Sequence, residues 1–196
     1  MPPRAGLNED VIASAAAEVA DEVGLPGVTL AAVADRLRVR APSLYKHVDG
    51  LAGLLRCLSA HASEEMARRL TRVAIGKSGE HAVLAIADAY REYARERPGL
   101  YAATLRAPDE NEHRRIKAAQ ETLNVIGAAL DQYALPPDIL VHAIRGLRSV
   151  IHGFVVLEWS GSFGMPESVD QSFSFAIRTY LRGLQSDRPE RAPPGR

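Results

Sequence analysis

The sequence predicts an all-α fold with about nine helices, and two observations carry this prediction. The β-branched residues recur at helical rather than alternating spacing, and no Asn-Gly or Asp-Gly pair is flanked by strand-like runs. Breaks that contain glycine and proline separate the periodic segments. We therefore expect a three-helix head at the N-terminus, joined by one long helix to a larger helical bundle.

The head is predicted to contain three short helices. The first covers 8–23, with Asn8 as its N-cap and two acidic residues in its first turn, where the helix dipole favours them. After the Leu-Pro-Gly break at 25–27, Thr29 caps a second helix that ends at residue 37. A third helix of about two turns, at 42–48, begins with a proline, which suits the first helical position.

The long helix and the bundle follow the head. Asp49 caps a helix that runs to about residue 73, and residues 75–79, with two glycines, form the candidate linker. Five further helices are predicted, at about 79–96, 98–106, 109–133, 137–159 and 167–185.

These elements predict two domains with flexible ends. The head is expected at 8–57, with its last helix continuing to about 75, and the second domain is expected at 79–185. Residues 1–7 and 187–196 are rich in proline, glycine and arginine, cannot contribute to a core, and are predicted to be flexible tails.

Length and cysteine content bound the class of protein. The 196 residues can bury a core without covalent staples, and the one cysteine, Cys57, can form no intrachain disulfide. The N-terminus lacks the apolar stretch of a signal peptide, and the longest apolar runs are shorter than the roughly 20 residues of a membrane span. We expect a soluble, cytoplasmic protein without a membrane partner.

The overall charge does not indicate a nucleic-acid partner. The 24 basic residues (Lys and Arg) equal the 24 acidic ones, and residues 1–50 are slightly acidic as a block. Four basic residues nevertheless lie close together, with one acid nearby: Arg36, Arg38, Arg40 and Lys46. A basic spot of this size can bind phosphate without a basic protein around it.

The second and third helices have the pattern of a helix-turn-helix. Small residues at Ala31, Ala32 and Ala34 allow the helices to cross closely. The N-terminal part of the second member enters the major groove in such motifs, where a serine can contact a base edge and small apolar groups a thymine methyl. The other outward residues are better placed to bind phosphates. A contact between one of the arginines and a guanine base is left open as an alternative. The predicted DNA-binding residues are Thr29, Arg38, Arg40, Ala41, Pro42, Ser43, Tyr45, Lys46 and His47.

These residues resemble a known family. Thr29-Leu-Ala-Ala-Val-Ala-Asp-Arg-Leu, followed by Ala41-Pro-Ser-Leu-Tyr-Lys-His-Val, is similar to the DNA-binding head of the tetracycline-repressor (TetR) family over residues 8 to about 57. The resemblance implies a homodimeric repressor that binds a palindromic DNA operator and releases it when a small molecule enters the C-terminal domain.

The chain departs from the family pattern in one place. The family usually has a lysine near the start of the long helix, whereas this chain has Asp49-Gly-Leu-Ala. We expect backbone amides at the helix N-terminus to take over the phosphate contact of that lysine.

The C-terminal half resembles a subgroup of the same family. Residues 145–158 and 161–164 are similar to the C-terminal domain named for a Trp-His-Gly (WHG) signature, over about 90–185. His152-Gly153 and Leu157-Glu158 match, but Arg148 stands where that subgroup commonly has its tryptophan. The resemblance therefore implies the domain type and not a pocket geometry.

The helix at 137–159 is apolar nearly all round, so it must be buried on more than one side. Together with the last helix, it predicts a symmetric four-helix contact between two copies of the chain, and a monomer with a large core is the alternative. The predicted dimer-interface residues are Ile144, Leu147, Ile151, Val155, Phe173, Ile177, Tyr180 and Leu181.

Some residues of the C-terminal half combine apolar walls with polar groups, as a ligand pocket requires. The same residues can equally be core. The predicted pocket residues are Tyr90, Tyr93, Tyr101, Leu105, Leu123, Ile126, His142, His152 and Trp159.

No pattern indicates an enzyme, a metal site or a cofactor. The six histidines are dispersed, and His-Glu-x-x-His, Cys-x-x-Cys and Gly-x-Ser-x-Gly motifs are missing. The alternative to a DNA-binding regulator is a helical module that binds a protein or stores a ligand without contacting DNA.

Overall fold

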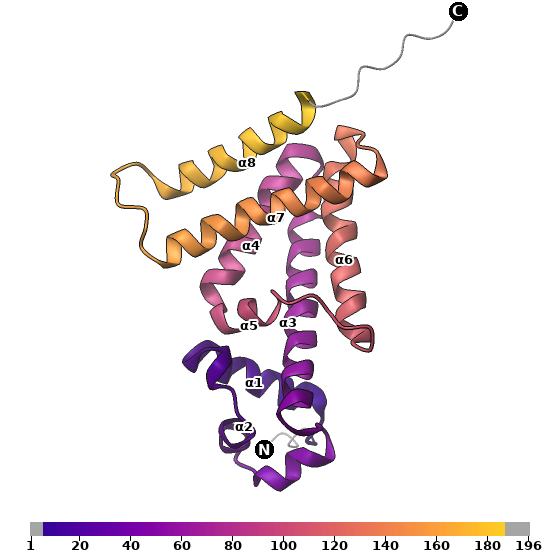
Figure 1. The fold of residues 1–196 in the computed structure, drawn as a ribbon, viewed down its shortest axis with the longest axis vertical. Coiled ribbons are helices and arrows are strands. Elements are labelled where there is room, and N and C mark those ends of the chain that lie inside the picture. The colour runs from indigo at the N-terminus through magenta and orange to yellow at the C-terminus, as the bar shows by residue number, and fades with distance from the viewer. Residues whose placement is uncertain (1–5, 187–196) are drawn as a thin grey trace, which may run out of the picture. The chain divides into compact units, whose positions relative to one another are not determined.

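The computed structural model describes residues 6–186, so residues 1–5 of the tail predicted at 1–7, and the whole tail predicted at 187–196, lie outside the described residues. The described part contains helices and no strand, which confirms the all-α prediction (Figure 1). The elements are α1 (Glu9–Val23), η1 (Leu25–Gly27), α2 (Leu30–Leu37), η2 (Ala41–Lys46), α3 (Gly50–Ala74), α4 (Gly79–Glu96), α5 (Pro98–Ala103), α6 (His113–Leu130), η3 (Asp131–Tyr133), α7 (Pro137–Trp159) and α8 (Val169–Ser186), where η marks a 3-10 helix.

Three helices differ from their predicted form. The helix predicted at 42–48 is the 3-10 helix η2, in which Ser43 N donates to the Arg40 carbonyl at 2.8 Å, because so short a segment closes i→i+3 bonds. The helix predicted at 98–106 ends at Ala103. The helix predicted at 109–133 begins only at His113, because the Glu112 carboxylate accepts the Asp109 amide at 2.7 Å in a turn ahead of it.

The chain forms two compact units, which differ from the predicted domains. Unit 1 contains 6–69 and 92–122 of the described residues, and unit 2 contains 70–91 and 123–186. The predicted linker at 75–79 lies inside unit 2, where it is the turn between α3 and α4. Unit 1 therefore includes α5 and the first part of α6 besides the head.

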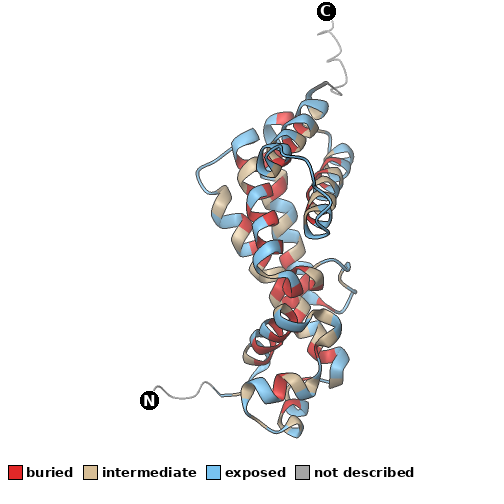
Figure 2. Ribbon diagram, turned by 90° about the vertical axis from the view of Figure 1, so that its left-hand side faces the viewer, coloured by how far each residue is buried: buried red, intermediate tan, exposed pale blue. Residues whose placement is uncertain are grey.

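Unit 1 is built around α1. Figure 2 shows buried residues on its helices. Ile12 of α1 and Leu44 of η2 are fully buried. Gly99 of α5 approaches the α1 backbone so closely that a Cβ at this position would lie 2.1 Å from the carbonyl carbon and oxygen of Ala20. Only glycine fits there without a shift of one helix.

Charged groups also hold α5 on α1. The Asp21 carboxylate accepts the amides of Gly99 at 2.9 Å and Leu100 at 3.2 Å, and it pairs with Arg97 Nε at 2.5 Å. Arg97 Nη1 reaches Glu65 of α3 at 3.3 Å. One carboxylate of α1 thus satisfies the first amides of α5, which have no partner within their own helix.

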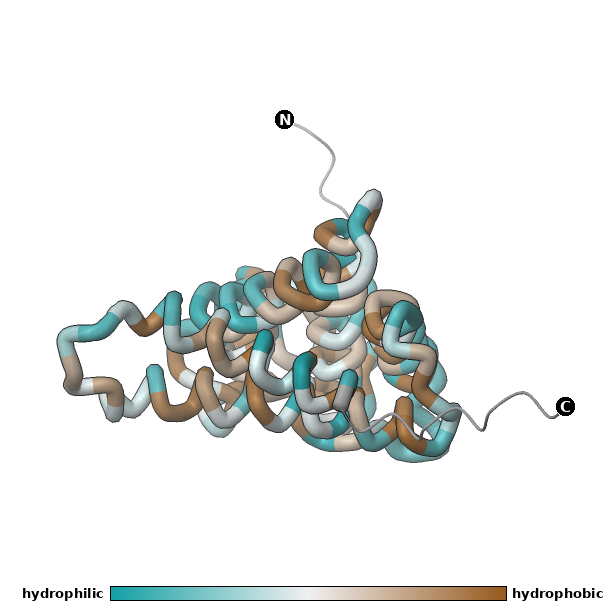
Figure 3. Tube along the Cα trace, turned by 90° about the horizontal axis from the view of Figure 1, so that it is seen from above, coloured by the Kyte–Doolittle hydropathy of each residue, from teal (hydrophilic) through white to brown (hydrophobic). Residues whose placement is uncertain are grey.

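Unit 2 contains the antiparallel pair α7 and α8, which lie side by side in Figures 1 and 3. The two helices contact each other, and each of them buries apolar residues, among them Leu147 and Ile151 of α7 and Phe173 and Ile177 of α8. Gly146 of α7 permits close contact, since a Cβ there would lie 2.4 Å from Tyr180 Oη, which donates to the Ala143 carbonyl at 2.7 Å.

A buried arginine connects these helices to α4. Arg91 is 7% exposed and donates to Glu158 of α7 at 2.8 Å and 2.6 Å, and to Asp170 at 2.8 Å. Its guanidinium carbon lies 5.4 Å from the ring centre of Phe154 and 5.0 Å from that of Phe173. The carboxylates hold the pKa of Arg91 above its usual value, with the Glu158 hydrogen bond as the largest cause.

The predicted dimer-interface residues are largely core residues of unit 2. Seven of the eight are at most 9% exposed within a single chain, and the eighth, Tyr180, is half-buried with its hydroxyl bonded to Ala143. The prediction was wrong because an apolar stripe does not tell whether its partner is another helix of the same chain or a second copy. The seven buried residues are Ile144, Leu147, Ile151, Val155, Phe173, Ile177 and Leu181.

The prediction that no segment resembles a membrane span also needs correction for α7. By length and composition, this helix of 23 residues passes the test for a span, because its average apolar character outweighs the interruptions at His152 and Glu158. Core helices of soluble proteins pass the same test. One stripe of α7 packs on α8, and its other positions include Arg145 and Arg148.

Candidate nucleic-acid interface

The helix-turn-helix begins with a capped helix, as predicted. Thr29 Oγ1 accepts the Ala32 amide at 3.1 Å, which satisfies one of the free donors of the first turn of α2. At its C-terminus, Arg38 adopts the left-handed conformation with φ 55°, and Val39 N donates to the Ala34 carbonyl at 2.9 Å. This turn redirects the chain into η2.

The recognition segment, residues 41–47, is anchored by apolar residues on one side. Leu44 is fully buried and Val48 is 4% exposed, so the residues between and before them are turned toward solvent. Tyr45 is 61% exposed and Lys46 is exposed, while Ser43 and His47 are half-buried. The outward placement of Tyr45 and Lys46 is as predicted.

All nine predicted DNA-binding residues lie within one short stretch of unit 1, and none is buried in the chain. Thr29, Arg38, Arg40 and Pro42 are exposed, and Ala41 is half-buried. The stretch can therefore present hydroxyl, guanidinium and ammonium donors to a duplex. Contact of these residues with DNA remains a prediction.

The basic spot has fewer available charges than the sequence indicated, because Arg36 forms ion pairs with α1. Arg36 donates to Glu18 of α1 at 3.0 Å and also to Glu22, and these hydrogen bonds, Glu22 first, raise the pKa of Arg36. Its charge therefore joins α2 to α1 and is partly neutralised. Of the basic residues in the spot, Arg38, Arg40 and Lys46 have neither ion pairs nor hydrogen bonds from their side chains to other described residues.

The start of α3 lies at Asp49-Gly50, where the sequence departs from the family pattern. The exposed Asp49 precedes Gly50, which has a φ of 61°, a conformation that favours glycine. Gly53 N donates to the Asp49 carbonyl at 2.9 Å, which begins the helical hydrogen bonding. The amides of the first turn of α3 are the groups that could meet a phosphate here.

The predicted ligand-pocket residues are distributed over both units. Tyr93, Tyr101 and Leu105 belong to unit 1, whereas the other six belong to unit 2. Tyr93 and Tyr101 are fully buried, and Tyr93 Oη donates to the Ala62 carbonyl at 3.2 Å. Burial raises the pKa of Tyr93, which accords with a core role.

The six predicted pocket residues in unit 2 differ in their burial. Tyr90 and Ile126 are buried, whereas Leu123, His142 and Trp159 are exposed and His152 is half-buried. The set was chosen by side-chain type on apolar helix faces, and such faces are mostly core. The proposal that they line a single pocket has no support in the structure.

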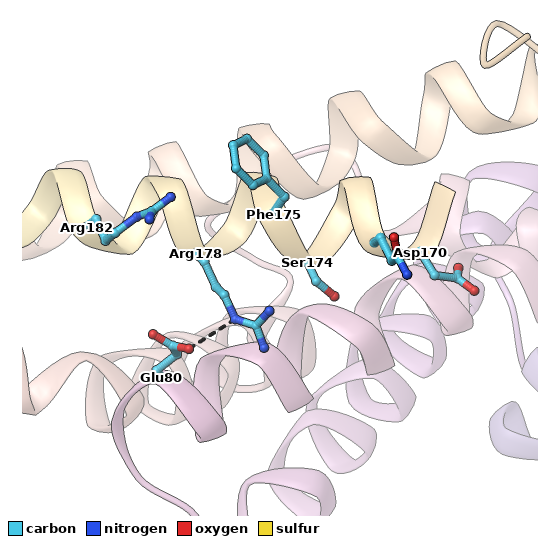
Figure 4. A pocket seen from close by; sticks show the side chains of 7 residues that line it. Glu80, Asp170, Ser174, Phe175, Arg178 and Arg182 are labelled. Atoms are coloured by element: carbon cyan, nitrogen blue, oxygen red, sulfur yellow. Dashed lines mark hydrogen bonds and ion pairs between the residues drawn. The ribbon is translucent and has the colours of Figure 1, made fainter. Parts of the chain in front are cut away.

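A hollow that the sequence did not indicate lies beside α8 (Figure 4). It has a volume of about 660 Å³ and is lined by residues of α4 and α8. Phe175, which is 65% exposed, belongs to it, and Arg178 Nε donates to Glu80 at 3.2 Å across it. Helical periodicity could have shown that Phe175 lies off the buried stripe formed by Phe173 and Ile177.

No group of three or more histidine, cysteine, aspartate or glutamate side chains in residues 6–186 is arranged to hold a metal ion.

Comparison with known proteins gives three concordant results. Residues 83–180 match the family model of the tetracyclin repressor-like C-terminal domain. The chain is 37% identical over 185 residues to an uncharacterized HTH-type transcriptional regulator of Bacillus subtilis, YobS, covering 94% of this chain and 96% of that protein. It is 34% identical over 160 residues to a second such regulator, from Mycobacterium tuberculosis, covering 80% of this chain and 72% of the relative.

Solved structures share the fold. A TetR variant from Acinetobacter baumannii, in complex with minocycline, superposes with a TM-score of 0.68 at 23% identity, covering 94% of this chain and 99% of that one. The transcriptional regulator SCO7222, a TetR from Streptomyces coelicolor, superposes with a TM-score of 0.71 at 21% identity, covering 92% and 98%.

Proposed function

Because this chain belongs to the TetR family of helix-turn-helix transcriptional regulators, we propose that it is a repressor that binds a palindromic DNA operator as a homodimer. A small molecule bound in the C-terminal domain releases the DNA. The protein acts in the cytoplasm and catalyses no reaction.

One observation carries the DNA-binding role. Leu44 and Val48 are buried and anchor the recognition segment, whereas Tyr45 and Lys46 are exposed to solvent. Ser43 lies in the N-terminal half of the segment, which enters the groove in helix-turn-helix proteins. Ser43 is assigned to a base edge, and the charged and phenolic groups are assigned to phosphates.

The homodimer follows from the reach of one head, since a single short recognition segment covers only a few base pairs and a palindrome needs two. The corrected contact surface uses exposed rather than buried residues of α7 and α8. Val141, Val156 and Leu157 are each more than 40% exposed on α7, and Phe175 is 65% exposed on α8. Apolar residues at these positions lose exposed area in a symmetric contact.

The response to a small molecule is supported by the family domain at 83–180 and by the minocycline complex of the Acinetobacter protein. Repression needs only occupancy of the operator, whereas activation would need a further contact with the transcription machinery. The chemical identity of the effector is open to direct screening, by titrating candidate compounds against the protein bound to its operator.

The DNA-binding role is tested by a mobility shift with DNA that flanks the coding region of the protein. Lys46→Ala should weaken binding about equally for all sequences and reduce the magnitude of the slope of log K against log salt by about 1 per head, or about 2 for the homodimer. Lys117→Ala, a lysine 80% exposed on α6, is the matched control and should change neither quantity. Ser43→Ala should relax the preference at one base position, and Tyr45→Ala should cost about 1 kcal/mol on every operator.

The proposal fails if the flanking DNA gives no saturable binding above that of a nonspecific competitor. It also fails if Lys46→Ala and Lys117→Ala behave alike while Tyr45→Ala and Ser43→Ala leave affinity unchanged. Either result would favour the alternative of a helical module that does not contact DNA.

A further inference from the structure

A second hollow, entirely within unit 1, lies directly behind the recognition segment. Its volume is about 420 Å³, and it is lined by residues of α1, α3 and α6 together with the segments just before α3 and α6. His47 and Asp49 border it where η2 ends, and Arg56 and Cys57 of α3 line its wall. This volume is in the range of cavities that hold small organic molecules.

Arg115 forms part of the lining and has an unused donor. The side chain is 2% exposed; its Nη1 donates to Glu112 at 3.1 Å, and its Nη2 donates to the Arg106 carbonyl. Its Nε is buried and has no hydrogen-bond partner among residues 6–186. A buried donor without an acceptor is costly, so Arg115 has the capacity for one acceptor beyond those that the described residues supply.

Two more arginines of the lining have donors to spare. Arg114 binds Glu64 through Nε and Nη2 and Asp10 through Nη2, which leaves its Nη1 unbonded within the described chain. The Arg56 side chain is exposed and makes no hydrogen bond or ion pair to any described residue. These arginines, together with the positive N-terminal end of α6, a helix of 18 residues, favour an anion.

The acidic residues of the lining do not reverse this preference. Glu112 already accepts from Arg106, Arg115 and the Asp109 amide, and despite its burial these groups hold the pKa of Glu112 below its usual value. Both carboxylate oxygens of Glu112 therefore already accept hydrogen bonds. Glu9 and Asp49 are exposed, so water satisfies them, and they lie at positions where they can limit the size and charge of an anion.

We propose that this hollow is a binding site for a small organic anion with more than one carboxylate group, separate from the effector site of the C-terminal domain. The carboxylates would meet Arg56, Arg114 and Arg115. Because His47 belongs to the recognition segment and also lines the hollow, an anion held there lowers the positive potential at the segment. Bound anion and DNA phosphates then weaken each other, and they do so by the same factor.

Cys57 offers a local probe, because it is the one cysteine in the chain and lines the hollow. Burial, with a smaller contribution from Glu9, raises the pKa of its thiol, so alkylation is slow enough to follow. We would measure the rate of alkylation by iodoacetamide, a neutral reagent, in rising citrate at constant ionic strength kept with chloride. Saturable protection of Cys57 by citrate is the expected result.

Variants test the charge of the site. Arg56→Gln should weaken the protection by citrate about tenfold, as expected for the loss of one charged hydrogen bond. Arg68→Gln, another exposed arginine of α3 that does not line the hollow, is the matched control and should leave it unchanged. Glu9→Gln should strengthen it about threefold, because it removes a negative charge near the anion.

The proposal is overturned if citrate gives no saturable protection, if Arg56→Gln and Arg68→Gln behave alike, or if Glu9→Gln weakens binding, as it would for a cation. Protection by duplex DNA alone would make the hollow part of the DNA interface and would also overturn it. Since the assay with citrate contains no DNA, its failure is distinct from a failure of the proposed DNA binding. A mobility shift with and without citrate then measures the coupling.

Discussion

Two arginines that join separate helices of unit 1 lie in partly exposed ion pairs, whereas one that joins helices of unit 2 is buried. In unit 1, Arg97 and Arg114 form ion pairs with side chains 31% and 43% exposed, so water competes for them. In unit 2, Arg91 has a side chain only 8% exposed and lies against two phenylalanine rings. Exposed pairs contribute little to stability, whereas removal of one partner from a buried pair is costly. The comparison teaches that burial, rather than the number of ion pairs, decides which arginine the fold depends on.

The largest loss of stability is expected where two backbones are in close contact. Gly99→Ala would place a Cβ 2.1 Å from the Ala20 backbone, so α5 must move away from α1, at a cost of about 3 kcal/mol in the free energy of unfolding. Urea denaturation measures this quantity. Gly153→Ala is the control, because a Cβ there has open space, and it should leave stability unchanged or raise it by up to about 1 kcal/mol.

Loss of the buried arginine of unit 2 is expected to have an effect of similar size. Arg91→Met leaves Glu158, whose side chain is 21% exposed, without its charged partner and should destabilise the protein by about 3 kcal/mol. Asp170→Asn changes the other pair of the same arginine, but Asp170 is 80% exposed, so the loss should stay below about 1 kcal/mol. Equal losses for the two variants would show that burial does not explain the difference between the units.

Asp21 of unit 1 lies between these extremes, with a side chain 17% exposed. Asp21→Ala removes the acceptor of two α5 amides and the partner of Arg97, so we expect a loss of about 2 kcal/mol. Asp10→Ala removes a partner of Arg114 that is 71% exposed and should cost less than about 1 kcal/mol. Equal losses of stability for Asp21→Ala and Asp10→Ala, measured by thermal unfolding, would contradict the ranking by burial.

The smallest effect is a pH dependence in unit 1. Burial lowers the pKa of His61 below 6.5, although Glu65 at 3.7 Å opposes the shift. The unfolded chain therefore binds the proton more readily, and stability present above pH 6.5 is lost as the pH falls toward the lower pKa of the folded state. His61→Gln should flatten the stability profile between pH 7.5 and 5.5, by less than the effect of Asp21→Ala. A steeper profile in the variant would mean that the folded chain binds the proton better.

The head was predicted well because its signals are local. Asn8 Oδ1 accepts the Val11 amide at 2.9 Å and Thr29 caps α2, both as expected from residues within one turn of each other. Tyr45 is exposed because Leu44 and Val48 occupy the single apolar side of the segment. A short element with one apolar side has one way to pack, so its outward residues can be named in advance.

The bundle was predicted less well because its signals are ambiguous at the level of single residues. Leu147 and Ile151 were assigned to a dimer contact but are 1% and 2% exposed within one chain. Tyr93 and Tyr101 were assigned to a pocket but are fully buried, and Tyr93 Oη donates to the Ala62 carbonyl. Apolar character predicts burial, but it does not identify the element that does the burying.

The sequence by itself determined the all-α class, most helix ends, the helix-turn-helix and the family, because hydrogen-bonding caps, turns and apolar periodicity act between residues close in the chain. The tertiary structure alone decided that Arg36 is engaged by α1, that α5 and the start of α6 join the head in unit 1, and that Arg91 is buried between phenylalanines. Those outcomes depend on which distant surfaces meet, and the free energy of such contacts is set by burial and geometry that exist only once the chain has folded.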